Sequence, residues 1–556
     1  MNMTAEAKAT MPVNQNPAAA SAEINFMGGI SYKLNPLDTL KIITASSIFG
    51  EAQYYNDGGK DVAGIKKTPI FKIDEAFDDY VLDVMTDFKG KNTVEIMETA
   101  IDNALSYNFE KTLDWAITLR KEYFMRLNPQ IIMTRAAMHP DRKAFTESHK
   151  GEFVRINCEV MSRADDVINQ LTYYLYLNKS KNNIPGILKK SWTKKIESLT
   201  NYELYKYRNH GIGLINTIRI CHANSEAINE LMRTGTIDMP ENEKTWESLR
   251  AINKTWAEIT STIKMGHMAL LRNLRGIFSE IEDFDTRAKL LTYLENGVAN
   301  GKQFPFRYET AYRMIETCSD ITNKTAILDS LENCIDKSCE NLPHLKGNNA
   351  FLSDNSGSAW GACPSEYGTE TVAEIGNLSC VIGAANSDTG TVFKFGDELK
   401  SYEISKRQGI IKQAREISKS RGRDVGCSTE NGIWLFFEKA LEEKIKYDNI
   451  FIYSDMQAGH GRLYGTPKCA EKYKRLGFCL KSYHDYIDVA KLIDAYRKTV
   501  NPKVNVFCVQ TAGYTNALVP ENGYRTAILT GWTGKELVYA KTMNDFWDEK
   551  DAENSV

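Results

Sequence analysis

Hydrophobic side chains recur at helical spacing from about Phe26 to Pro343. In the segments 96–105 and 327–335, apolar residues return every three or four positions, which places them on one face of a helix. The breaks between such segments contain Gly-Gly, Asn-Pro or His-Pro pairs. Many amphipathic helices with short breaks predict stacked helix pairs, a HEAT-like solenoid, instead of one bundle. No fixed repeat length occurs in the sequence, so we expect the solenoid to be irregular.

The pattern changes after Leu345, where short apolar runs typical of buried strands begin. The predicted strands are Ala350–Ser353, Ser379–Ala384, Thr391–Phe395, Ile450–Ser454, Val504–Val509 and Arg525–Leu529. Helical patterns separate most of these runs and cover Gln408–Ser420, Glu430–Lys446 and Asp485–Lys498. Strands that alternate with helices predict a mostly parallel, doubly wound sheet.

The length of 556 residues is too great for one hydrophobic core, so two or three domains are expected. We predict a multidomain α plus α/β protein. Its parts are a disordered N-terminal arm (1–25), a helical module (26–345), an α/β domain (346–546) and an acidic, solvated tail (547–556).

Composition narrows the functional classes only slightly. Hydrophobic residues make up 42% and charged residues 25% of the chain, and the net charge is −3. These values are typical of soluble globular proteins, so any basic surface for a nucleic acid has to be local. The 11 cysteines are scattered and suit reduced, buried thiols in a cytoplasmic protein. Neither a signal-peptide core nor a run of about 18 apolar residues occurs, so no membrane association is expected.

A local basic stretch lies between Lys179 and Arg219. It contains nine Lys or Arg residues against two acids, and Trp192, Tyr202, Tyr205 and Tyr207 are interleaved with them. Cations follow phosphates and aromatic rings stack on unpaired bases, so this composition fits single-stranded RNA or DNA. A solvated helix face with inward-packed tyrosines explains the same composition equally well.

A second basic stretch, from Lys264 to Arg275, has three Lys or Arg residues, including Arg272, together with His267 and no acid. Its leucines are expected in the core. Its arginines either line a surface or stabilise the C-terminal end of a helix.

An Asp-x-Ser-x-Ser motif follows the first predicted strand of the α/β domain, at Asp354, Ser356 and Ser358. An acid and two hydroxyls at the carboxyl end of a buried strand lie where α/β sheets bind ligands. Alone, the motif is more often an ordinary turn.

Two later residues reach the same edge of the predicted sheet. Thr429 precedes a helix, where threonine also acts as a helix N-cap, and Asp455 follows the strand Ile450–Ser454. Together with Asp354, Ser356 and Ser358 they form a set of hard oxygen ligands suited to octahedral Mg²⁺. One position would remain for an oxygen from outside the protein.

At these residues the sequence resembles known families. The set Asp354-x-Ser356-x-Ser358, Thr429 and Asp455 resembles the metal-ion-dependent adhesion site of a von Willebrand factor A domain. The helical half resembles the TROVE module of the Ro autoantigen family. The segments that carry this second resemblance are 206–222, Thr245-Trp246-Glu247, Ala269–Leu274 and Gln303–Phe306.

The resemblance implies a ring of helical repeats closed by the A domain. It implies that a Y RNA or a similar noncoding RNA binds the outer basic surface and that single-stranded ends of misfolded RNAs enter the central hole. The matching positions imply RNA contacts at Lys206, Arg208 and His222, and we add Arg219 and Arg272 from the two basic stretches. His222 follows Ile220 and Cys221, so a core position is the alternative.

No catalytic template is recognisable in the sequence. It lacks a Gly-x-x-x-x-Gly-Lys-Ser/Thr loop, a His-Glu-x-x-His motif and a Gly-x-Ser-x-Gly elbow. We therefore expect a noncoding-RNA scaffold in RNA quality control and not an enzyme. The alternatives are a module that binds a protein carboxylate, such as one from an exoribonuclease, through the metal, and a Mg²⁺-dependent nuclease using Asp354 and Asp455.

Overall fold

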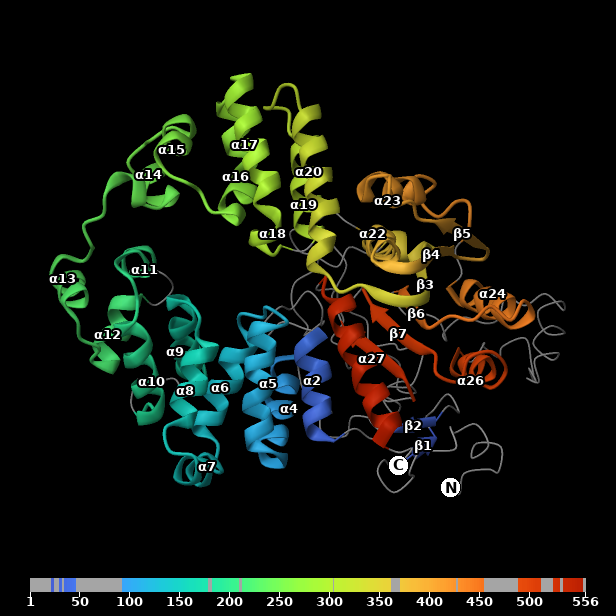
Figure 1. Cartoon of the computed structure of the whole chain (residues 1–556), viewed down its shortest axis with the longest axis horizontal. Helices are drawn as coiled ribbons and strands as arrows, with labels where there is room; N and C mark the ends of the chain where they lie inside the picture. The colour runs from blue at the N-terminus through green and yellow to red at the C-terminus, as the bar shows by residue number, and fades with distance from the viewer. Residues whose placement is uncertain are drawn as a thin grey trace.

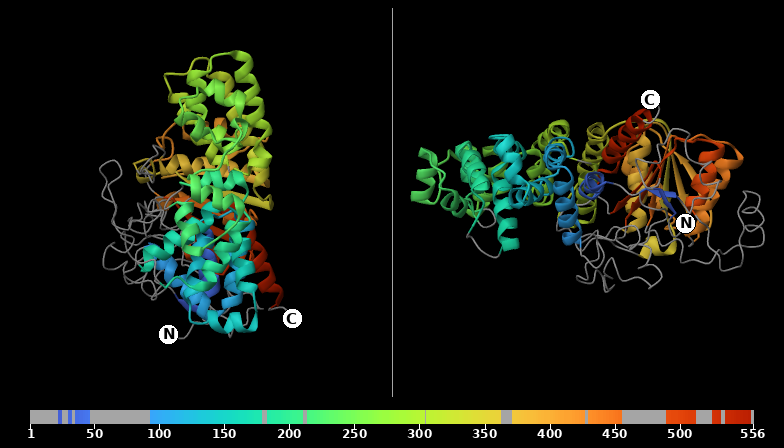
Figure 2. Two further views of the ribbon diagram at one scale, coloured as in Figure 1. Left: turned by 90° about the vertical axis from the view of Figure 1, so that its left-hand side faces the viewer. Right: turned by 90° about the horizontal axis from the view of Figure 1, so that it is seen from below.

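The computed structural model describes residues 22–24, 30–32, 35–46, 93–178, 183–209, 213–303, 305–361, 371–426, 429–454, 489–511, 524–530 and 534–553. They form a curved row of helices and a β-sheet covered by helices (Figure 1). The sheet unit contacts both ends of the row, through α20 on one side and α2 on the other. The chain therefore closes into a ring (Figures 1 and 2).

The helical row begins with α2 (Pro36–Ser46), α4 (Thr93–Tyr107), α5 (Phe109–Lys121), α6 (Asn128–Met138), α7 (Arg142–Ser148), α8 (Glu152–Val160), α9 (Ala164–Asn178) and α10 (Gly186–Glu197). It continues with α11 (Asn201–Tyr207), α12 (Leu214–Cys221), α13 (Glu226–Thr234), α14 (Trp246–Ala251) and α15 (Trp256–Thr262). It ends with α16 (His267–Glu280), α17 (Phe284–Asn296), α18 (Val298–Gly301), α19 (Pro305–Thr317) and α20 (Thr325–Ser338). The short 3₁₀ turns are η3 (Glu241–Glu243) and η4 (Cys339–Asn341).

Local sequence signals account for many helix boundaries. Thr200 and Thr255 begin α11 and α15 as capping boxes, in which the threonine hydroxyl accepts the N–H of a glutamate three residues later. The predicted apolar faces are buried, as Leu105 in α4 and Leu331 in α20 illustrate. Among the helices of the described ranges, none combines the length and apolar character that a membrane span requires.

The second unit is a six-stranded sheet with the order β5-β4-β3-β6-β7-β8. Its strands are β3 (Leu345–Asp354), β4 (Ser387–Phe395), β5 (Leu399–Glu403), β6 (Asn449–Ser454), β7 (Asn505–Gln510) and β8 (Thr526–Thr530). All neighbouring pairs are parallel except β4 and β5. The direction of strand order reverses at β3, so the ends of β3 and β6 flank the topological switch point.

Helices cover both faces of this sheet. They are α21 (Gly357–Gly361), α22 (Val372–Ala385), α23 (Ile410–Ser418), α24 (Thr429–Glu442), α26 (Val489–Thr499) and α27 (Glu536–Glu553). Phe351 packs with α22 and α27 in a core continuous with that of the helical row, whereas its neighbours Ala350 and Leu352 pack with α24 and α26. The alternation follows from the two-residue period of a strand. The predicted doubly wound domain after a helical-repeat ring is confirmed.

One predicted strand is wrong. Ser379–Ala384 lies within α22, a helix buried on almost every side between the sheet and α23. A continuous apolar run does not distinguish a buried strand from a fully buried helix. Gly383 permits the contact, since a Cβ at this position would lie 2.3 Å from the Phe351 ring. The edge strand β5 was not predicted, because its residues are only partly buried and lack an apolar run.

The chain ends differ from the predicted boundaries. Ala22–Ile24 forms a strand (β1) antiparallel to Ile30–Tyr32 (β2), and the rest of the predicted arm lies outside the described residues. The predicted tail starts inside α27. Its carboxylates Asp548 and Asp551 pair with the buried guanidinium of Arg525, at 2.5 and 2.6 Å. These acids therefore anchor α27 to the start of β8, although the Asp548 side chain stays exposed.

The sheet unit meets the two ends of the helical row through different chemistry. On the α20 side, Asp336 and Glu332 accept backbone N–H groups of Ile410 and Lys412 at the start of α23. On the other side, α27 faces α2 and α5 across an apolar crevice, beside which Lys535 Nζ donates to the carbonyl of Tyr123. The ring is thus closed by a polar seam and a largely apolar seam.

Candidate functional site

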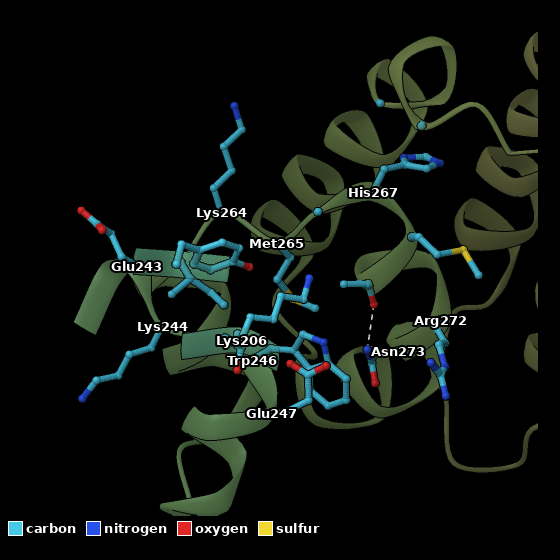
Figure 3. Close-up of a pocket in the computed structure, with 18 of the residues that line it drawn as sticks. Lys206, Glu243, Lys244, Trp246, Glu247, Lys264, Met265, His267, Arg272 and Asn273 are labelled. Atoms are coloured by element: carbon cyan, nitrogen blue, oxygen red, sulfur yellow. Dashed lines mark hydrogen bonds between the residues drawn. The ribbon is translucent and has the colours of Figure 1, made fainter. Parts of the chain in front are cut away.

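A cavity of about 1400 Å³ lies inside the helical row, lined by residues from Arg126 to Gly301. Six Lys or Arg residues and three acids line it: Arg126, Arg163, Lys206, Lys244, Lys264 and Arg272, against Asp165, Glu243 and Glu247. Figure 3 shows Lys206, Lys244, Lys264 and Arg272 projecting from different elements in different directions around the cavity. Positive charge is therefore spread along its walls, as it would be for a ligand with repeated negative charges.

One wall of the cavity holds three of these cations close together. Arg126 and Arg163 both pair with Asp165 near the start of α9, with 3.1 Å between Arg163 Nε and the carboxylate. Behind them, the buried Arg120 pairs with Asp166 at 2.7 Å. Two half-exposed guanidinium groups thus share one buried carboxylate on this wall.

Lys206 adds a third cation to the same wall from the last turn of α11. Its amine lies 5.7 and 5.5 Å from the ring centres of Tyr202 and Tyr207. Burial lowers the pKa of Lys206, and the neighbouring charge of Arg163 lowers it further. No carboxylate of the described residues lies within ion-pair distance of the Lys206 amine. An anion at this position would relieve the repulsion among the three cations.

The aromatic residues of the first basic stretch divide into core and surface. Trp192 is fully buried and its Nε1 donates to Gln170 Oε1 at 2.8 Å, and Tyr205 and Tyr207 are buried as well. Tyr202 is 41% exposed and lines the cavity. Only this ring of the four can therefore stack on a ligand. Trp246, half-buried on α14, provides a second ring in the cavity wall.

The opposite wall contains His267, at the start of α16. Its ring fills a slot beside Gly297 and Gly301, where an added Cβ would approach the imidazole to 2.5 and 2.4 Å. His267 Nε2 and the Tyr308 hydroxyl share a hydrogen bond of 2.7 Å. Burial lowers the pKa of His267, so the ring is neutral at pH 7 and fixes this wall without adding charge.

The five residues predicted to contact RNA do not form one group. Lys206 and Arg272 both line the cavity. Arg208 lies outside the cavity lining, with its guanidinium 4.1 Å from the Tyr205 ring centre and donating to the Tyr205 carbonyl. Arg219 and His222 are exposed on α12 and at its C-terminal end, also outside the cavity lining. The alternative that His222 is a core residue is therefore wrong.

Three of the cations that line the cavity were not predicted from the sequence: Arg126, Arg163 and Lys244. Lys244 follows the acidic turn η3, and the other two precede helices whose apolar pattern gives no functional signal. Nothing in their local sequence separates them from ordinary surface cations. The curvature of the helical row brings them together.

The predicted strand-end site lies at the switch point of the sheet. Asp354, at the end of β3, is buried; its Oδ1 accepts the Ser356 N–H at 2.9 Å and its Oδ2 accepts the Ser454 hydroxyl at 2.6 Å. The hydroxyls of Ser356 and Ser358 lie 3.3 Å apart. Ser454, the last residue of β6, was not predicted as part of this site.

This arrangement fits a small, hard cation. Adjacent ligands of an octahedral Mg²⁺ with bonds of about 2.1 Å are about 3.0 Å apart, which is close to the separation of the two serine hydroxyls. Among the described residues, no group of three or more His, Cys, Asp or Glu side chains is placed to hold a metal ion. A cation here would rely on hydroxyl oxygens beside Asp354. The Thr429 side chain and Asp455 lie outside the described residues.

An ion pair between a buried lysine and a partly exposed aspartate holds the loop that leads to α24 and Thr429. The amine of Lys394 is fully buried and donates to Asp424 at 2.8 Å, to Ser420 Oγ at 2.6 Å and to the Ile417 carbonyl at 2.7 Å. Burial raises the pKa of Asp424, but the hydrogen bonds from Lys394, Ser420 and Lys400 outweigh burial and hold that pKa well below its usual range. Asp424 is therefore ionised at neutral pH.

A helical-repeat ring closed by a doubly wound α/β domain, with Asp-x-Ser-x-Ser at its switch point, defines the class of this protein. The structure is similar to that of the Ro (RSR) protein of Deinococcus radiodurans, with a TM-score of 0.56 and 13% sequence identity over 92% of this chain and 100% of that chain. No protein-family model and no curated protein sequence matches the chain. The Ro-like architecture predicted from the sequence is confirmed.

Proposed function

We propose that this protein is an RNA-binding scaffold that holds single-stranded RNA in its central cavity. The observation that carries the proposal is the cavity wall itself, with six Lys or Arg residues against three acids and the rings of Tyr202 and Trp246. Distributed cations bind successive phosphates, and exposed rings stack on unpaired bases. The likeness of the fold to a Ro protein supports the same role.

The size of the cavity favours a flexible polymer over a metabolite. Pockets for small molecules usually enclose about 300–1,000 Å³, and this cavity is larger, at about 1400 Å³. It is also open, and its cations point in different directions (Figure 3). A few unpaired nucleotides, whose backbone bends between contacts, match this arrangement.

A second RNA surface is proposed on the outside of the ring. Lys190, Lys194 and Arg219 are exposed on α10 and α12, and His222 is exposed at the C-terminal end of α12. We assign these residues, with Arg208, to a small structured noncoding RNA of the Y or Y-like type. Ends of misfolded RNAs would enter the cavity while this RNA stays outside, which is a role in RNA quality control or processing.

The strand-end site is a second candidate for function. Mg²⁺ held by Asp354, Ser356 and Ser358, with Thr429 and Asp455 as further predicted ligands, would present an open position to a carboxylate of another protein. The observation that favours this role is the gathering of Asp354, Ser356, Ser358 and Ser454 at the switch point. An exoribonuclease is the type of partner we propose.

Catalysis is not part of the proposal. A Mg²⁺-dependent nuclease commonly uses a two-metal cluster of several carboxylates, and Asp354 is surrounded by hydroxyls. Cleavage of RNA by the purified protein with Mg²⁺, lost in Asp354→Asn, would establish the nuclease alternative instead.

Direct binding tests the proposal. Fluorescence anisotropy would compare a single-stranded RNA decamer with a blunt duplex of the same sequence, at fixed salt. We expect the single strand to bind more tightly, and Lys206→Ala and Arg272→Ala each to weaken it by about tenfold, the loss of one charged contact. Unchanged affinity in both variants would show that the cavity is not the RNA site.

A further inference from the structure

The first wall of the cavity differs from the rest because its cations converge. Arg126, Arg163 and Lys206, named here the α9–α11 cluster, influence one another's charge, whereas Lys244, Lys264 and Arg272 are spread out (Figure 3). Asp165 is the carboxylate of the described residues that pairs with the cluster. Two of the three cations therefore share one acid, and the third, Lys206, pairs with none of the described carboxylates.

Glu247 is the other acid that faces the cluster. It is exposed on α14, and its charge raises the pKa of Lys206 less than Arg163 lowers it. Among the described residues it forms no ion pair with Lys206. With Asp165 and Glu247 both counted, the cluster keeps one positive charge in excess, and Arg163 remains the charge with the largest effect on the pKa of Lys206.

The two guanidinium groups of the cluster are held in place. Arg163 donates from Nε to the Tyr207 hydroxyl at 3.1 Å, and its backbone N–H donates to Asp166 at 2.9 Å. Arg126 donates to Asp165. An anion that binds here meets donors whose positions are already fixed, so less side-chain entropy is lost on binding.

The excess charge separates two kinds of phosphate. An internal phosphodiester of RNA carries one negative charge, whereas a terminal phosphate carries about −1.5 to −2 at pH 7 and presents three acceptor oxygens. Three converging cations attract the terminal phosphate more strongly than an internal phosphodiester, because the terminal group carries more charge and has an additional acceptor oxygen. A hydroxyl end offers the cluster no charge.

We propose that the α9–α11 cluster binds the terminal phosphate of a single-stranded RNA, so that the cavity prefers RNA ends that carry a phosphate to ends that carry a hydroxyl. This inference rests on the proposed function, in which RNA enters the cavity. In this proposal Arg126, Arg163 and Lys206 distinguish an RNA end that carries a phosphate from one that carries a hydroxyl.

The test uses the full-length protein and three RNA decamers of one sequence, with a 3′-phosphate, with a 5′-phosphate, or with hydroxyls at both ends. Fluorescence anisotropy should show about tenfold tighter binding of one phosphorylated RNA, the gain expected from an additional charge-assisted contact. Which end carries the preference identifies the polarity of the bound strand. Equal affinities for all three RNAs would overturn the inference and leave the proposed function standing, whereas binding of none would overturn both.

Variants and a pH series distinguish a specific role of the α9–α11 cluster from the effect of the overall positive charge of the cavity. Lys206→Ala should abolish the preference for the phosphorylated end. Lys264 is a cavity cation outside the cluster. The variant Lys264→Ala should therefore weaken the binding of all three RNAs equally and keep the preference for the phosphorylated end. Lowering the pH through about 6, where a terminal phosphate takes up its second proton, should reduce the ratio of the two affinities. A ratio that stays constant with pH, or that survives in Lys206→Ala, would contradict the assignment.

Discussion

The central cavity and the strand-end site of the sheet are built in opposite ways. The strand-end site takes Asp354, Ser356 and Ser358 from five consecutive residues and Ser454 from the adjacent strand. The cavity takes its cations from loops and helices between Arg126 and Arg272. The strand-end site requires only two adjacent strands. The cavity forms only when the whole row of helices is folded and curved.

The chemistry of the two sites differs in the same way. Oxygen atoms at the strand end lie within hydrogen-bond distance of each other and suit one small cation. Cations in the cavity are spread over several walls and suit an extended polyanion. If the two sites are independent, a change in one should leave the other intact, and this can be measured.

The largest effect is expected in the cavity. Lys206→Glu/Arg272→Glu removes two exposed cations, which should weaken the binding of single-stranded RNA about 100-fold, and adds two repulsive charges, which should bring the loss to about 1,000-fold. The slope of log affinity against log salt should also fall in magnitude by about 1.4. Fluorescence anisotropy over a salt series measures both quantities.

A charge-matched control variant tests whether the loss of affinity is specific to the cavity. Lys143→Glu/Lys419→Glu reverses two side chains that are 80% and 76% exposed and lie outside the cavity lining. This variant should bind the same RNA within about twofold, since distant surface charges are screened. If both variants lose affinity equally, overall charge and not the cavity controls binding.

The next largest effect concerns the loop beside the strand-end site. Asp424→Asn leaves the buried amine of Lys394 without its carboxylate and should lower the free energy of unfolding by about 3 kcal/mol. Urea denaturation measures this change in the free energy of unfolding. Lys394→Met/Asp424→Asn removes both charges and should recover most of the loss. A cost below about 1 kcal/mol for the single variant would show that the pair does not hold this loop.

A smaller effect tests the metal at the strand end. Because Mg²⁺ would bind only the folded state, a concentration ten times its Kd should stabilise the protein by about 1.4 kcal/mol. Asp354→Asn should remove this gain, and the exposed Asp329→Asn on α20 should keep it. Thermal unfolding with Mg²⁺ and with a chelator gives the comparison, and RNA affinity should be unchanged in both variants. An equal Mg²⁺ response in Asp354→Asn would rule out the assigned ligand.

The smallest effect is a pH dependence from the cavity wall. Burial lowers the pKa of His267, so the unfolded chain takes up this proton at a higher pH than the folded protein does. The contribution of neutral His267 to the free energy of unfolding is therefore fully present above about pH 6.5. It is lost as the pH falls below this value, by up to about 1 kcal/mol per pH unit. His267→Gln should remove this slope between pH 6.5 and 5. An identical slope in the variant would assign it to another group.

The sequence predicted those parts of the protein that depend on neighbours along the chain. The Asp354, Ser356 and Ser358 motif was visible because its residues lie on one strand end and one loop. The apolar faces of α4 and α20 were visible because helical spacing is local. The helix α22 is buried on almost every side, so its continuous apolar run was mistaken for a strand.

The cavity could not be predicted in this way. Arg126 and Arg163 are brought next to Lys206 by the packing of α9 against α11 and by the loop after α5, and no local pattern marks them. Arg208 is separated from Lys206 by a single residue, yet it stacks on Tyr205 outside the cavity. The direction of each side chain on α11 decided which of them lines the cavity, and that direction follows from tertiary packing.

Crosslinking of a single-stranded RNA to the protein would show directly whether the RNA lies in the cavity. A short RNA containing 4-thiouridine would be bound, irradiated and digested, and mass spectrometry would identify the attached peptides. We predict attachment at the cavity rings of Tyr202 and Trp246, which are exposed and half-buried respectively, and its loss in Lys206→Glu/Arg272→Glu. Crosslinks confined to the sheet unit or to helices outside the cavity would contradict it.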